Sequence, residues 1–162
     1  MSEWQFARLD SDHQTLALAS CGGRLPFVIH WGPHLAEEDD LRALAITHER
    51  ALGRAMLDHL PELSLCPEDG WGFPGHPGLR GSRADGTGWL TRFRLVSMTG
   101  AGGAVSIIGR DEIANLEIGL FLELKPASSV IESRATITNI GADDYRLDWL
   151  SAPVMTLQIS LP

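Results

Sequence analysis

Cysteine and lysine are both scarce in this sequence, and each shortage limits the kinds of site that the chain can build. The 162 residues include only two cysteines, Cys21 and Cys66, and neither belongs to a Cys-x-x-Cys pair. This spacing argues against a zinc site, and we favour two buried thiols over a bridge because free cysteine is among the most buried residue types. Lys125 is the only lysine, and the formal net charge is −8. An acidic chain with no dense basic cluster does not attract phosphate backbones, so nucleic acid is not an expected partner.

Long apolar runs are also missing. No run reaches the roughly 18 residues that a membrane span needs, and the start Met1–Trp4 lacks the basic region and apolar stretch of a signal peptide. We therefore expect a cytoplasmic chain with no membrane partner. The hydrophobic share of 44 % is that of ordinary globular proteins. A chain of this length suits one domain that folds without a metal or a disulfide.

Apolar residues recur with the period of β-strands over most of the chain. The clearest case is residues 116–124, where leucine or isoleucine at every second position predicts a strand with one buried face. Further strands are expected over residues 4–9, 15–18, 25–31, 89–98, 105–108, 131–138, 145–149 and 154–161. Trp4, Trp89 and Trp149 fall in these segments and are expected to pack in the core or between sheets. Because helices do not alternate with strands, the pattern favours a mainly β fold of two packed antiparallel sheets.

One helical insertion interrupts the strands around residues 41–60. Apolar positions there, beginning with Leu41, Leu44 and Ala45, follow helical spacing. The acidic residues 37–40 come just before, where negative charge complements the helix dipole. We expect one helix or two short ones that cover an edge or a face of a sheet.

A long loop rich in glycine and proline spans residues 64–88. Loops longer than about 12–15 residues are uncommon in compact domains and are often functional. This one carries Trp71, Phe73, His76 and Arg80. An aromatic face in a loop suits the apolar C–H face of a sugar ring. The alternative for Trp71 is that it anchors its own loop.

The sequence offers no clear catalytic set. Adjacent carboxylates at 39–40, 111–112 and 143–144 are interpreted as solvated charges in turns. Glycoside hydrolysis needs two carboxyl groups facing each other about 5–10 Å apart, whereas neighbouring strand residues point to opposite faces. His30 and His34 have no third ligand spaced for a metal, so hydrogen-bonded histidines are favoured over a metal site. No catalytic residue, metal site or cofactor is predicted.

Five segments, taken in order along the chain, carry a resemblance to a known family. They are Leu25–Leu35 with its Trp31-Gly32, Pro67–Leu79 with its Gly70-Trp71-Gly72, Asn115–Ile118, Val130–Gly141, and Leu150–Ala152 with the closing Leu161-Pro162. In this order they resemble the N-terminal domain of glycoside hydrolase family 36, the melibiase-type bacterial α-galactosidases. The resemblance spans nearly the whole chain and implies a β-supersandwich of the galactose-mutarotase-like kind, which agrees with the strand pattern.

The resemblance also implies that another domain carries the chemistry. Residues 1–162 would form a single non-catalytic N-terminal β-sandwich domain, because both catalytic aspartates of the family lie in a downstream (β/α)₈ barrel of about 250 residues. The closing apolar segment agrees with a boundary inside a longer protein. That protein would be a retaining glycosidase acting on terminal α-galactosides. Its own barrel and galactoside oligosaccharides would be partners, and a homo-oligomer is expected.

In the tetrameric bacterial members, a Gly-x-Gly-Asp-Phe-Arg loop reaches toward the active site of a neighbouring subunit. Phe73, Pro74 and Gly75 take the Asp, Phe and Arg places of that motif here. The charged sugar contacts are therefore missing unless His76 or Arg80 replaces them. The residues predicted to contact substrate are Trp71, Phe73, His76 and Arg80.

Two other functions are weighed against this one. A stand-alone carbohydrate-binding module predicts a preformed aromatic platform and affinity for galactosides in the isolated chain. A mutarotase-like sugar epimerase needs a paired acid and base in one cleft, and the sequence offers no convincing His/Glu pair for that role.

Overall fold

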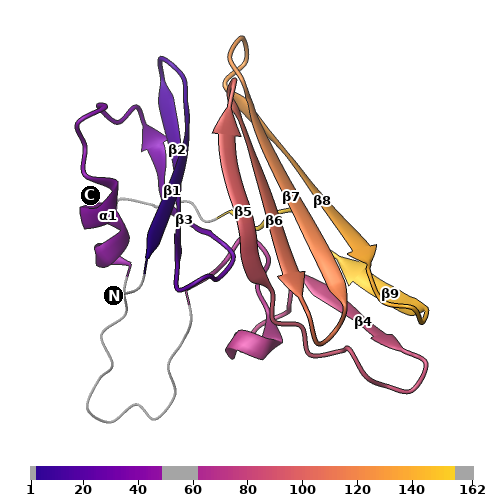
Figure 1. Cartoon of the computed structure of the whole chain (residues 1–162). Helices are drawn as coiled ribbons and strands as arrows, with labels where there is room; N and C mark the ends of the chain where they lie inside the picture. The colour runs from indigo at the N-terminus through magenta and orange to yellow at the C-terminus, as the bar shows by residue number, and fades with distance from the viewer. Residues whose placement is uncertain (1–2, 49–61, 156–162) are drawn as a thin grey trace, which may run out of the picture.

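The protein is built from stacked layers, seen in a computed structural model that describes residues 3–48 and 62–155. A short helix, a three-stranded sheet and a four-stranded sheet follow one another across the molecule (Figure 1). The strands are β1 (Trp4–Asp10), β2 (Gln14–Cys21), β3 (Phe27–Pro33), β4 (Leu79–Arg83), β5 (Arg94–Ala101), β6 (Ala104–Asp111), β7 (Leu116–Lys125), β8 (Val130–Asn139) and β9 (Tyr145–Leu150), and the helical elements are α1 (Leu41–Thr47) and the 3₁₀ turn η1 (Asp69–Trp71).

The sheets are antiparallel throughout. Their strand orders are β1-β2-β3, β5-β6-β7-β8 and β4-β9. The two-stranded sheet continues from one end of the four-stranded sheet, beside β8 (Figure 1). The predicted mainly β fold of packed antiparallel sheets is confirmed.

The core lies between the two larger sheets. Every second side chain of β7 from Leu116 to Leu124 is 2 % exposed or less, as the period-two pattern predicts. These side chains share one buried cluster with Leu16 and Leu18 of β2 and with Phe93. Burying such a side chain contributes about 1.5–3 kcal/mol relative to leaving it exposed, so this face of β7 determines how the sheets stack.

α1 covers the other face of the three-stranded sheet. Its N-cap is Asp40, whose carboxylate accepts hydrogen bonds from Arg42 N and Ala43 N at 2.9 and 3.1 Å. Ala45 is buried in a second, smaller cluster whose other buried members are Ala17, Ala19, Phe27 and Ile29. The helix predicted around residues 41–60 is confirmed over 41–47, and residues 49–60 lie outside the described part of the chain. No helix among the described residues is long and apolar enough to cross a membrane.

The segment 64–88, predicted as a loop, contains the strand β4. The reason lies at Gly81, where a Cβ would come within 2.4 Å of Arg146 O and 2.5 Å of Tyr145 Cε1. This glycine therefore marks close packing of β4 against β9 and not a turn.

The strand predicted over residues 89–98 begins only at Arg94. Ahead of it, Arg92 N donates to the Asp111 carboxylate at 2.6 Å and not to a strand carbonyl. Of the strand predicted over 154–161, the two described residues lie in no strand, and the others lie outside the described part of the chain.

The three strand tryptophans differ in burial. Trp4 is half-buried and stacks on Phe6 with ring centroids 5.9 Å apart. Trp89 is 59 % exposed and Trp149 is 49 % exposed. The prediction that these two pack in the core is wrong, because Trp89 lies ahead of β5 and Trp149 lies among exposed residues of β9.

Both cysteines are free thiols, as predicted. Cys66 is buried, with 1 % of its surface exposed. Cys21 is only partly buried at the end of β2, so the expectation of burial is confirmed for Cys66 alone.

Candidate functional site

The glycine-rich segment is tied to the rest of the fold by backbone hydrogen bonds. Leu65 N donates to Pro26 O, and Gly78 N donates to Pro67 O, each at 2.8 Å. Between these points the chain makes the single turn η1 and leaves it through Gly72, whose φ of 82° lies in the left-handed region that favours glycine. The glycines therefore shape a fixed loop.

Trp71, the last residue of η1, is surrounded by arginines. The guanidinium carbons of Arg92, Arg24 and Arg94 lie 3.9, 4.4 and 4.8 Å from the centroid of its ring. At these distances each cation is attracted to the face of the indole. The indole Nε1 is buried and has no hydrogen-bond partner among the described residues. We call Trp71 and its three arginines the arginine cluster.

Glu68 links η1 to the segment that leads into β5. It is 3 % exposed, and its Oε1 accepts a hydrogen bond from Phe93 N at 2.5 Å. Its backbone oxygen accepts from Trp71 N at 3.2 Å and from Phe73 N at 3.3 Å. Burial raises the pKa of the Glu68 carboxyl to about 8, against the opposing influence of the Phe93 bond and of two nearby arginines. The carboxyl is therefore mostly protonated at neutral pH.

Asp111, the last residue of β6, is 4 % exposed. Its Oδ1 accepts from Ile113 N and Ala114 N, both at 2.9 Å, and its Oδ2 accepts from Arg92 N at 2.6 Å. The interpretation of residues 111–112 as solvated charges is wrong for Asp111, because three backbone N–H groups stabilise its carboxylate inside the protein. One side chain thus closes the β6–β7 turn and ties it to the segment before β5.

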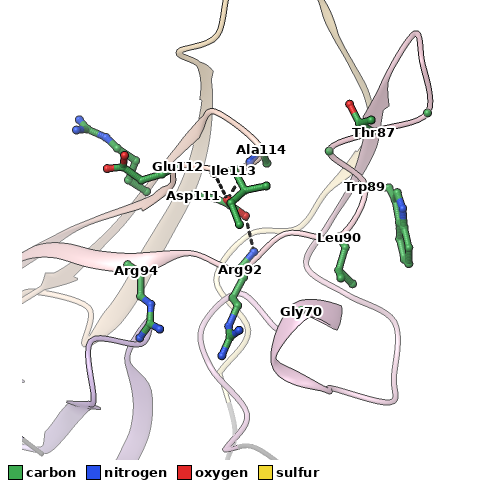
Figure 2. A pocket seen from close by; sticks show the side chains of 13 residues that line it. Gly70, Thr87, Trp89, Leu90, Arg92, Arg94, Asp111, Glu112, Ile113 and Ala114 are labelled. Atoms are coloured by element: carbon green, nitrogen blue, oxygen red, sulfur yellow. Dashed lines mark hydrogen bonds between the residues drawn. The ribbon is translucent and has the colours of Figure 1, made fainter.

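A pocket of about 620 Å³ opens where these segments meet. Its walls come from the segment before β5 and from the β6–β7 turn (Figure 2). Trp89, Leu90 and Ile113 line it and are 59, 49 and 94 % exposed. Arg92 and Arg94 line it as well and belong at the same time to the arginine cluster. Ligand sites are typically about 300–1,000 Å³ and combine apolar walls with a few polar groups, so the pocket has the size and chemistry of a ligand site.

The structure brings two of the four predicted sugar-contact residues together. His76 lies edge-on to Trp149, with ring centroids 5.2 Å apart. Arg80 of β4 is the cross-strand partner of Trp149 in β9. His76, Arg80 and Trp149 are all exposed, so they form one accessible group.

The other two predicted residues have contacts of their own. Phe73 lies across Gly75, where a Cβ would come within 2.6 Å of Phe73 Cε1. Trp71 is held in the arginine cluster, and guanidinium groups cover its ring. The arrangement of Trp71 is that of a residue that anchors its own loop, and sugar contact by the four residues stays a prediction.

A comparison with known families identifies the domain. The Glycosyl hydrolase family 36 N-terminal domain matches residues 24–160. The chain belongs to this family. The resemblance found in the sequence is confirmed, and the chain is a non-catalytic N-terminal domain of the family 36 type.

Two solved structures share the fold of this family 36 N-terminal domain. The alpha-galactosidase from Lactobacillus brevis has a TM-score of 0.75 and 16 % sequence identity over 91 % of this chain and 23 % of that one. The galactosidase domain of the alpha-galactosidase-sucrose kinase AgaSK has a TM-score of 0.71 and 15 % identity over 94 % of this chain and 25 % of that one. This chain thus spans about a quarter of the length of either structure. No curated protein is a significant match.

The sequence analysis does not predict that Arg24, Arg92 and Arg94 of this family 36 N-terminal domain gather around Trp71. A signal was present for Arg92 and Arg94, because residues two apart in an extended segment project to the same side. No local signal marks Arg24, which reaches Trp71 only because the fold brings the end of the β2–β3 turn to η1.

Proposed function

We propose that this chain is the N-terminal part of an α-galactosidase that removes terminal α-galactosyl residues from oligosaccharides, and that it packs on the catalytic barrel of the same polypeptide. The observation that carries the proposal is the family match over residues 24–160. The fold that the chain shares with two alpha-galactosidase structures supports it. In this proposal the remaining three quarters of the polypeptide supply the chemistry.

The surface of the domain supports a packing role. Large apolar side chains are exposed at Ile46, Trp89, Leu90, Val96, Ile113, Val130, Ile140, Leu147 and Trp149. β8 lies at the end of its sheet, and its inward-facing Ile131, Ala135 and Ile137 are only partly buried. A neighbouring domain that packs on this one would cover part of these exposed apolar side chains.

The two buried carboxyl groups also support a non-catalytic role. Glu68 and Asp111 both accept hydrogen bonds from backbone N–H groups. A general acid or base has to reach the proton that it transfers, and these two groups are committed to holding the fold. The same contacts weigh against the mutarotase-like alternative.

The galactoside contact is the finer part of the proposal. Of the four predicted residues, His76 and Arg80 are the ones that we favour, because they are exposed beside Trp149 and so offer an aromatic surface next to hydrogen-bond donors. Phe73 and Trp71 would instead support the loop. We further propose that the protein works in the cytoplasm as a homo-oligomer.

The test compares the chain with the longer polypeptide that this proposal predicts. We expect the 162-residue chain to hydrolyse no p-nitrophenyl α-galactoside and to give no heat with galactose, melibiose or raffinose in isothermal titration. The polypeptide extended through a downstream barrel should hydrolyse the substrate. Turnover by the chain alone would contradict a non-catalytic role. Galactoside binding by the chain alone, lost in Trp71→Ala or Trp149→Ala, would favour the carbohydrate-binding module.

A further inference from the structure

Three positive charges converge at one place on a chain whose formal net charge is −8. The guanidinium carbons of Arg24, Arg92 and Arg94 all lie within 4.8 Å of the centroid of the Trp71 ring. Because all three lie so near one point, the distances between the guanidinium groups do not greatly exceed the Debye length of about 8 Å at physiological ionic strength. The three positive charges therefore repel one another. A cluster of this kind is stabilised by any negative group that joins it.

Of the three arginines around Trp71, only Arg24 has an ion pair within residues 3–48 and 62–155, between its Nη1 and Glu62 Oε2 at 3.0 Å. Arg94 Nη1 donates to the backbone oxygen of Gly22 at 3.1 Å, which fixes the side chain without neutralising it. The Arg92 guanidinium packs on Trp71, and only its backbone N–H is hydrogen-bonded within these ranges. Arg92 and Arg94 therefore have no ion-pair partner in the described part of the chain.

The carboxyl groups nearest the pocket form no ion pair with Arg92 or Arg94 in the described part of the chain. Both oxygens of Asp111 accept backbone N–H groups. Glu112 extends away from the two arginines (Figure 2). Burial raises the pKa of Glu68 to about 8, so this carboxyl is mostly neutral at pH 7. The positive charge is consequently available to a molecule that enters the pocket.

Beside the two arginines, Trp89, Leu90 and Ile113 bring large apolar side chains to the pocket. Trp89 and Leu90, which are 59 and 49 % exposed, extend to the same side of the chain as Arg92 and Arg94 (Figure 2). We propose that Arg92 and Arg94 bind the oxyanion of an organic anion whose apolar body lies against Leu90 and Trp89. The planar guanidinium presents several N–H donors in a fork that matches a carboxylate. This site goes beyond the proposed function, because galactosides carry no charge.

Isothermal titration of the 162-residue chain with 1-naphthoate tests this site. Naphthoate joins a carboxylate to a flat apolar body. 1-Naphthalenemethanol has the body without the charge, and acetate has the charge without the body. We expect naphthoate to bind, and the other two compounds to bind about tenfold more weakly or less. Added NaCl should weaken the binding of naphthoate.

Substitutions at the arginines show whether binding occurs where we propose. Arg92→Gln and Arg94→Gln are each expected to weaken naphthoate binding about tenfold, because each removes a charge-assisted contact. Arg92→Lys keeps the charge and should lose less. Arg42→Gln, at an exposed arginine of α1, is the matched control and should bind naphthoate like the unchanged chain. Circular dichroism and the urea midpoint check folding, and Arg94→Gln carries the test if Arg92→Gln does not fold.

A peptide distinguishes the two sources of such an anion. If N-acetyl-Leu-Glu-Leu amide binds more tightly than naphthoate, the site is assigned to an acidic side chain of a partner polypeptide. If naphthoate binds more tightly than the peptide, the site is assigned to a free small molecule. The proposal is overturned if neither probe binds at millimolar concentration, if both Gln variants bind naphthoate unchanged, or if melibiose displaces naphthoate. None of these outcomes depends on whether the longer polypeptide hydrolyses α-galactosides.

Discussion

Arg92 lies over Trp71, with its guanidinium carbon 3.9 Å from the centroid of the indole ring. The contact joins the end of η1 to the segment before β5, and Arg24 and Arg94 contact the same ring from 4.4 and 4.8 Å. A cation on an aromatic face contributes about 0.5–1 kcal/mol at an exposed site. The three contacts connect η1 to the β2–β3 turn and to the start of β5.

Trp71→Ala is expected to lower the free energy of unfolding by about 2–3 kcal/mol, because it removes the ring and all three cation contacts. Trp71→Phe keeps an aromatic face and removes an N–H that has no described partner, so its loss should stay below about 1 kcal/mol. Urea denaturation followed by circular dichroism measures both. Trp149→Ala, at the half-exposed tryptophan of β9, is the control. A loss in Trp71→Ala no larger than in Trp149→Ala would contradict the anchoring role.

Glu68→Gln is expected to change how stability depends on pH. Folding raises the pKa of this carboxyl from 4.5 to about 8, so between these values the folded chain keeps a proton that the unfolded chain releases. The contribution of Glu68 to stability is therefore fully present below the unfolded pKa and is lost as pH rises toward the folded one. Inside the window, the free energy of unfolding falls by up to about 1.4 kcal/mol per pH unit. Gln keeps the oxygen that accepts the Phe93 N–H and does not titrate.

Urea denaturation across this pH window checks the role of Glu68. The unchanged chain and Glu68→Gln should be similarly stable near the low end of the window, about pH 5, and the variant should be the more stable near the high end, about pH 8. Glu112→Gln, at an exposed carboxylate, should follow the unchanged chain throughout. Parallel curves for Glu68→Gln and the unchanged chain would show that this carboxyl titrates normally.

Asp111→Ala is expected to destabilise the fold by about 3 kcal/mol, because it leaves the N–H groups of Arg92, Ile113 and Ala114 without their acceptor. Asp111→Asn keeps one acceptor oxygen and should cost less. Thermal or urea denaturation measures these changes, with Glu112→Ala as the neighbouring control, expected within about 0.5 kcal/mol of the unchanged chain. An equal effect of the two alanine substitutions would mean that the hydrogen bonds of Asp111 do not hold the turn.

The β architecture could be predicted from the sequence because alternation along a strand is a local pattern. β7 is the clearest example, since one face of it forms the core and every second residue is apolar. The boundaries between residues 64 and 94 could not be predicted, because long-range contacts decide them. Gly81 lies in β4 since the Tyr145 ring packs against it, and the Asp111 carboxylate holds Arg92 before β5 begins.

The candidate site was predicted only in part, for a similar reason. The high glycine and proline content of residues 64–88 predicts a loop, and Trp71 lies in this segment. The arginine cluster depends on Arg24 and Arg92, which come from two other parts of the chain. Trp89 and Trp149 were placed in the core because their segments resemble strands, but the facing surface that would bury them is not supplied by the described residues.

Gly81→Ala should destabilise the chain by about 2–3 kcal/mol, because its Cβ would lie 2.4 Å from the backbone oxygen of Arg146 and would collide with the Tyr145 ring. Gly100→Ala in β5 is the matched control. Its Cβ would meet only ordinary contacts, the nearest being Val105 Cγ2 at 3.8 Å, so the change should be neutral or slightly stabilising. Comparing the urea midpoints of the two variants separates close packing from glycine flexibility, and equal midpoints would contradict the packing of β4 on β9.

Ellman's reagent is expected to detect one reactive thiol in the native chain and two in concentrated urea. Cys66 is 1 % exposed, and burial raises the pKa of its thiol to about 12, so almost no reactive thiolate forms at neutral pH. Cys21 is partly exposed, and Cys21→Ser should therefore abolish the native reaction. Gly78→Ala should make Cys66 reactive, because the added Cβ would lie 2.6 Å from its Sγ and would force the two segments apart. Two rapidly reacting thiols in the native chain would show that the glycine-rich segment does not seal Cys66 from solvent.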